Sequence, residues 1–179
     1  MTLDPILIAA SRWCGVPYGH PRTRGDWSVV DCSTLTARVL EAVYGRLSTQ
    51  EWLDVVIGDA GRPWSPIELA SSRWGSEVTD PVPARWHLLQ GWRTMPPAQP
   101  ASGHAMLVWS SGGHLNVLEA QRGYGVRWRG APRAATAPLS LATAHPIAWE
   151  SLIRDYPDGI RLAVLGTVPL VTAEPVVPG

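Results

Sequence analysis

The fold is decided by the stretch from residue 104 to residue 120, HAMLVWSSGGHLNVLEA. Its apolar run at residues 105–109 has the length of a strand, and residues 110–113 are typical of a tight turn. Residues 115–120 then resume a strand. The stretch predicts a β-hairpin and therefore an antiparallel sheet in the second half of the chain.

The first half of the chain has helical periodicity instead. Apolar residues recur at helical spacing after Asp4 and Asp31, both of which suit the cap of a helix. Helices first and an antiparallel meander afterwards predict an α+β fold. The other expected elements are helices starting at residues 48 and 65, the first of them running to residue 57, a loop at 75–83, a loosely alternating segment at 85–93, strands at 126–129 and 160–168, and a helix at 146–155.

Length and composition bound the class of protein. The 179 residues predict one domain over residues 1–168, followed by a Pro-rich tail or linker at 169–179. Fifteen basic and fifteen acidic side chains leave no excess positive charge for nucleic acid, and no apolar run is long enough to span a membrane. The N-terminus lacks the pattern of a signal peptide, so we expect synthesis in the cytoplasm. No cluster has the spacing of metal ligands, and neither a metal nor another cofactor is expected.

Cys32 is the first candidate for chemistry. It follows Asp31 at the start of a predicted helix, where unpaired backbone N–H groups and the helix dipole favour a thiolate. A thiolate is a nucleophile, whereas a neutral thiol is a poor one. The alternative is that Cys32 is a small buried apolar residue. That reading suits Cys14, which lies late in an apolar helix.

A cysteine nucleophile needs a base, and His104 lies at the entrance of the first hairpin strand. A turn at residues 111–112, or a loop at 110–113, places His104 opposite Glu119, whose carboxylate would orient the imidazole. A turn at residues 112–113 would instead pair His104 with Gln121. Glu119 is the first choice and Gln121 the second. His20, in the loop before Cys32, is a possible substrate contact.

These residues, in this order, resemble the NlpC/P60 family of papain-like cysteine peptidases. The matching motifs are Gly-Val-Pro-Tyr at residues 15–18, Asp-Cys-Ser at 31–33, Gly-His at 103–104 leading into a strand, and Val-Leu-Glu-Ala at 117–120. The resemblance covers roughly residues 5–120. It implies a papain-like fold, with N-terminal helices packed on an antiparallel β-meander.

The resemblance also implies an activity, the hydrolysis of amide bonds in peptides of the bacterial cell wall. Cys32 would be the nucleophile, His104 the general base and Glu119 the orienting residue. Tyr18 would help to hold the oxyanion. Asp31 and Ser33 match positions that in some members contact the free amine of the substrate.

The chain also departs from the family pattern. Thr34 replaces the usual Gly after Asp-Cys-Ser, and the Trp-Gly-Gly element is replaced by residues 20–27, which include Arg22 and Arg24. These changes affect the expected substrate more than the expected reaction.

The implied partner is a peptidoglycan peptide. Without a signal peptide, the enzyme would reach the wall as a phage lysin, as a tail-associated hydrolase or through a secretion system, with a phage structural protein or an immunity protein as a possible partner. The alternatives are a papain-like amidase, deamidase or acyltransferase, and a non-catalytic interaction module with a structural Cys32.

Overall fold

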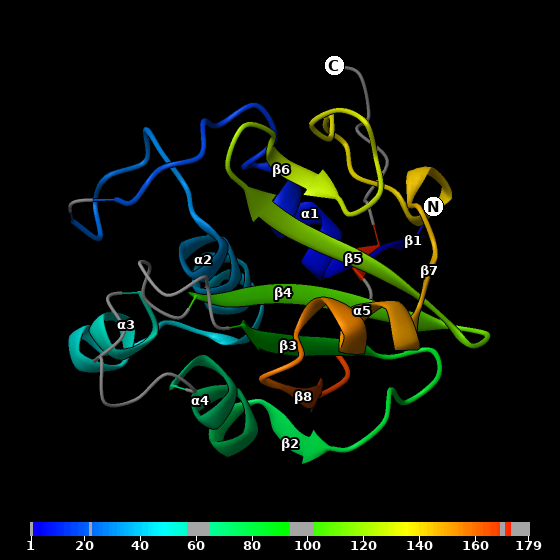
Figure 1. The fold of residues 1–179 in the computed structure, drawn as a ribbon. Helices are drawn as coiled ribbons and strands as arrows, with labels where there is room; N and C mark the ends of the chain where they lie inside the picture. Colours follow the sequence, from blue (N-terminus) through cyan, green and yellow to red (C-terminus); the bar gives the residue numbers. More distant parts are fainter. Residues whose placement is uncertain (1, 22, 57–64, 94–101, 169–170, 173–179) are drawn as a thin grey trace.

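The computed structural model describes residues 2–21, 23–56, 65–93, 102–168 and 171–172. Within these ranges the chain is an α+β protein built around one antiparallel sheet (Figure 1). The elements are β1 (Thr2–Leu3), α1 (Pro5–Ser11), α2 (Cys32–Tyr44), α3 (Thr49–Val56), α4 (Ser65–Arg73), β2 (Gly75–Val78), β3 (Trp86–Arg93), β4 (Ser102–Ser111), β5 (His114–Gln121), β6 (Gly125–Trp128), a 3₁₀ turn (Leu141–Thr143), β7 (Ile147–Ala148), α5 (Trp149–Asp155), β8 (Gly159–Leu165) and β9 (Val171–Thr172).

The strands of the main sheet follow the order β2-β8-β3-β4-β5-β6, and β7 pairs with β5 beside this path. The expected meander is the run from β3 to β6, in which each strand pairs with the next one along the chain. Strand β8 inserts between β2 and β3, so a late segment of the chain completes the sheet.

Two expected boundaries were wrong, and in both cases the cause is a partner distant in sequence. Residues 75–78 form β2 rather than a loop because they pair with β8. Gly75 permits this pairing, since a Cβ there would lie 1.8 Å from the backbone oxygen of Val164. The helix expected from residue 146 begins at Trp149, because Ile147–Ala148 pair with β5 as β7. The expected end of the third helix, at residue 57, lies outside the described residues.

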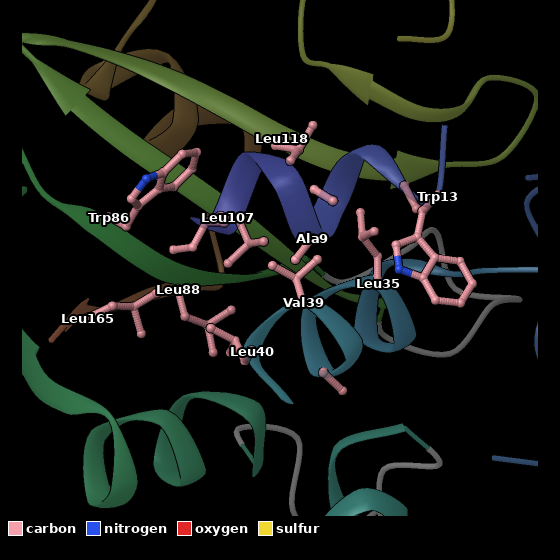
Figure 2. Close-up of a cluster of buried hydrophobic side chains, with 14 of the residues drawn as sticks. Ala9, Trp13, Leu35, Val39, Leu40, Trp86, Leu88, Leu107, Leu118 and Leu165 are labelled. Atoms are coloured by element: carbon pink, nitrogen blue, oxygen red, sulfur yellow. The ribbon is translucent and has the colours of Figure 1, made fainter. Parts of the chain in front are cut away.

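Helices cover both faces of the sheet, with α1 behind β5 and α5 in front of the central strands in Figure 1. Side chains alternate along each strand, so neighbouring residues enter different clusters. Leu107 and Leu118 pack against α1 and α2, as Figure 2 shows. Met106 lies on the opposite face, in the cluster that contains Leu152 of α5 and Tyr156, the residue that follows this helix. The sheet is therefore buried on both sides, and its central strands are rigid supports for side chains at their ends.

The two ends of the described chain lie side by side, because β1 pairs with β9. Val171–Thr172 belong to the segment expected to be a tail or linker, and the rest of that segment lies almost entirely outside the described residues. Among the helices of the described ranges, none is long and apolar enough to cross a membrane.

Candidate active site

Cys32 is the first residue of α2, as the sequence predicts. Asp31 caps this helix, and its Oδ1 atom accepts hydrogen bonds from the backbone N–H of Thr34 at 2.7 Å and from the Thr34 hydroxyl at 2.6 Å. A Gly at position 34 would lack this second donor, so Thr34 strengthens the cap. The cap fixes the position of Cys32 at the N-terminus of α2. The residue is buried there, with 8% of its surface exposed.

The Cys32 sulfur interacts with the His104 imidazole and the backbone of Ala105, both on β4, and both interactions lower the pKa of its thiol. Burial alone raises the pKa of the Cys32 thiol, but the hydrogen bond and the positive charge of His104 outweigh burial. The pKa of Cys32 is therefore lowered, although the nearby Asp31 carboxylate opposes the shift. The site favours a thiolate at a position within α2 where the helix dipole also favours negative charge.

His104 bridges Cys32 and Glu119. Its Nε2 atom lies 2.9 Å from Oε2 of Glu119, which leaves the other ring nitrogen for the sulfur. Burial lowers the pKa of His104, but hydrogen bonds to Cys32 and Glu119 and the charges of both raise it to about 9. Cys32, His104 and Glu119 can therefore be charged at the same time, with the imidazolium between the thiolate and the carboxylate.

Glu119 is buried, with only 2% of the residue exposed, and is paired with two arginines of the neighbouring segment. Arg127 Nε donates to Oε1 at 3.1 Å, and Arg129 Nη1 lies 3.4 Å from Oε2. Burial raises the pKa of Glu119, but His104, Arg129 and Arg127 together hold it below its ordinary value. Glu119 is thus an ionised acceptor, which places a proton on the facing nitrogen of His104.

The hairpin register differs from the first choice made from the sequence. Ser111 pairs with His114 and Leu107 with Leu118, so the turn is Gly112–Gly113. Both glycines have positive φ, 54° and 85°, which the tight turn requires. The expected direct pairing of His104 with Glu119 was therefore wrong.

Glu119 nevertheless reaches His104. Continued to His104, the observed register would place Gln121 opposite it and Glu119 two residues away on the same face, within reach of a long side chain. The β4–β5 pairs end at Leu107 and Leu118, and β5 continues by pairing with β6. The side-chain oxygen of Gln121 is buried without a hydrogen-bond partner, so Gln121 does not orient the imidazole through that atom.

Tyr18 and His20 approach the site from the loop before α2. His20 Nδ1 lies 2.7 Å from Asp31 Oδ2, although the His20 side chain is 77% exposed, and the rings of Tyr18 and His20 meet edge to face. Burial, followed by the charges of Cys32 and Asp31, raises the pKa of Tyr18 to about 12. Tyr18 therefore keeps its proton and can donate a hydrogen bond to a developing negative charge near the sulfur.

The remaining sequence candidates are also placed. Ser33 Oγ lies 3.9 Å from the Cys32 sulfur, at the limit of a weak hydrogen bond. Burial raises the pKa of Cys14 to about 11, which suits its expected structural role. Arg22 lies outside the described residues. Within the described ranges, no group of three or more His, Cys, Asp or Glu side chains has the arrangement of a metal site.

Sequence reasoning missed three side chains that hold Glu119 and His104. Arg129 also bonds Asp155 at 2.8 Å and the Tyr156 hydroxyl at 3.1 Å, and the ring of Tyr156 stacks on His104 with centroids 6.5 Å apart. The alternation of Arg127 and Arg129 about a buried Trp128 was a readable signal, because it puts both arginines on one face of a strand. Tyr156 gave no such signal, because no local sequence pattern connects the segment after α5 with His104.

Comparisons with protein-family models, with curated proteins and with solved structures found no match.

Proposed function

We propose that this protein is a cysteine hydrolase of the NlpC/P60 type, with a papain-like arrangement of helices and sheet, that cleaves amide bonds in peptidoglycan peptides. The observation that carries the proposal is the position of His104 between the Cys32 sulfur and the Glu119 carboxylate. Two features that both depend on His104 support the reaction class: the lowered pKa of Cys32 and the buried Glu119 carboxylate beside the imidazole.

The first half of the reaction forms an acyl-enzyme. The Cys32 thiolate attacks the amide carbon, and the carbonyl oxygen takes the negative charge. The Cys32 backbone N–H and the Tyr18 hydroxyl are the candidate donors to that oxygen. The His104 imidazolium then gives its proton to the amide nitrogen, the C–N bond breaks, and the amine leaves with a thioester on Cys32.

The second half releases the acid. His104, now neutral, takes a proton from water, and the resulting hydroxide attacks the thioester carbon. The C–S bond breaks, the electron pair returns to sulfur as thiolate, and His104 is again an imidazolium. Glu119 remains ionised throughout, because its role is to hold the imidazole and stabilise its charge.

The charged side chains near Cys32 suit a zwitterionic peptide. Asp31 Oδ2 faces His20, which is exposed enough to yield its place to a substrate amine. Arg122 is near enough to Tyr18 to lower that residue's pKa, and therefore offers a cation to a substrate carboxylate. Stem peptides of the bacterial cell wall carry both kinds of group.

The test is digestion of purified peptidoglycan with the wild type, Cys32→Ala and the matched control Cys14→Ala, followed by mass spectrometry of released fragments. We expect the wild type and Cys14→Ala to release the same peptides and Cys32→Ala to release none. A mass increase on Cys32, trapped by rapid acid quench, would identify the thioester. Identical products from all three proteins would overturn the proposal.

A further inference from the structure

A cavity lies away from Cys32, between α1, the loop before α2, α2 and α3. Its volume is about 530 Å³, within the usual range for a small-molecule site. Arg38 lines it from α2, six residues after Cys32, which corresponds to a rise of about 9 Å and a turn of about 240° around the helix. Arg38 and Cys32 therefore leave α2 on different faces, and the cavity is separate from the candidate active site.

The cavity walls combine indole rings with positive charge. Four arginines line it, namely Arg12, Arg24, Arg38 and Arg46. Among its lining residues in the described part of the chain, Glu41 is the only carboxylate. Glu41 is occupied, because its Oε1 atom forms an ion pair with Arg24 and also accepts the backbone N–H of Leu47 at 2.8 Å.

Arg38 differs from most arginines because it is buried in the cavity wall, with only 6% of the residue exposed. Its Nη2 atom donates to the backbone oxygens of Asp26 at 2.6 Å and Arg24 at 3.3 Å. Its Nε and Nη1 atoms are buried and have no hydrogen-bond partner. Buried N–H groups of a guanidinium are rarely left without an acceptor, and although Asp26, Glu41 and Asp31 offset the charge of Arg38, these two donors are available to a ligand.

Stacking on indoles does not supply that acceptor. The Arg38 guanidinium carbon lies 4.4 Å from the ring centroid of Trp13 and 4.6 Å from that of Trp27. The ring faces attract the positive charge but offer no lone pairs to the N–H groups. Trp27 is also 65% exposed while it stacks on Trp13, so a large apolar ring is held at the cavity wall without being buried.

We propose that this cavity binds a small organic anion, a carboxylate or a phosphate monoester carried on an aromatic or apolar group. The anionic oxygens accept from Arg38 Nε and Nη1, while the apolar group lies against Trp13 and Trp27. Arg46, which is exposed, adds positive charge at the wall. The proposal does not depend on the function proposed for Cys32.

The test is isothermal titration calorimetry of the full chain with benzoate, phenyl phosphate and the neutral benzamide. We expect saturable binding of at least one anion, weakened by added salt, and no saturation with benzamide in the same range. Binding of benzoate alone assigns a carboxylate ligand, and binding of phenyl phosphate alone assigns a phosphate. Failure of both anions to saturate at millimolar concentration, or equal binding of benzamide, would overturn the proposal.

Variants locate the site. Arg38→Met should weaken anion binding about tenfold or more, whereas the exposed Arg154→Gln on α5 should leave it unchanged. Because Arg38 also holds the loop before α2, its variant is first checked by thermal melting. If Arg38→Met does not fold, Trp27→Ala and Arg46→Gln decide the matter. Weaker binding in these two supports the site, and unchanged affinity in both contradicts it.

Discussion

Glu119 Oε2 and His104 Nε2 lie 2.9 Å apart, behind an imidazole whose other side meets the Cys32 sulfur. The carboxylate that orients the ring is itself held by Arg127 and Arg129. This relationship joins the N-terminus of α2 to strands β4 and β5, and it explains why the pKa of His104 is raised while that of Cys32 is lowered.

Glu119→Gln tests the carboxylate. An amide oxygen can still accept from Nε2, so the ring keeps a partner. The imidazolium and Arg127 lose the negative charge of Glu119, whereas Arg129 keeps its ion pair with Asp155. We expect kcat to fall by about 10²- to 10⁴-fold. Hydrolysis of a cell-wall peptide, with circular dichroism to confirm folding, measures the effect. An unchanged kcat in a folded variant would remove Glu119 from the mechanism.

The pH profile tests the ion pair. Activity requires the Cys32 thiolate, whose pKa is lowered, and the His104 imidazolium, whose pKa is about 9. Activity should therefore rise through a pKa below the ordinary thiol value of about 8.5 and fall as the pH passes about 9. Initial rates between pH 5 and 10, taken as rough limits that span both groups, provide the check. A profile that only rises above pH 8.5 would show a neutral thiol in the resting enzyme.

Arg127→Gln tests the support of Glu119. Loss of this cation should raise the pKa of Glu119, because Arg127 lowers it. We expect kcat to fall by about tenfold, because Glu119 is then held less firmly beside His104, while the acidic limb set by Cys32 stays in place. Arg154→Gln, a surface change on α5, is the control. A lower melting temperature with an unchanged kcat would indicate a structural role only.

Gly91→Ala tests the packing beneath His104. A Cβ at Gly91 would lie 2.3–2.5 Å from ring atoms of Tyr156, which stacks on His104. Since the ring must move, we expect a loss of about 1–3 kcal/mol in the free energy of unfolding. Gly25→Ala, where the nearest atom lies 4.0 Å away, should cost little. Denaturant unfolding compares the two, and equal stabilities would mean that Tyr156 is loosely packed.

Local sequence signals fixed the elements that carry the candidate site. Asp31 predicts the cap of α2, and the apolar runs around the glycine pair predict β4 and β5. The α+β class follows from these two halves. Chemistry at Cys32 and a base at His104 could be proposed because both side chains stand at the ends of regular elements.

Long-range pairing could not be predicted in the same way. The register of the hairpin depends on which of residues 110–113 form the turn. Turns at 111–112 and 112–113 and a loop at 110–113 were all compatible with the sequence, and the positive φ of Gly112 and Gly113 marks the turn that forms. Strand β2 forms by pairing with β8, a segment from much later in the chain. Tyr156 follows α5 and reaches His104 only in the folded chain. The arginine-lined cavity likewise arises from segments that no local pattern connects.

The most direct test of the central claim is the rate at which iodoacetamide alkylates Cys32 as a function of pH, measured in a Cys14→Ala background. We predict a reaction midpoint well below about 8.5 in this protein and a midpoint above that value in His104→Gln, because burial and Asp31 would then act without the imidazolium. A midpoint at or above 8.5 in the His104-containing protein would contradict the account.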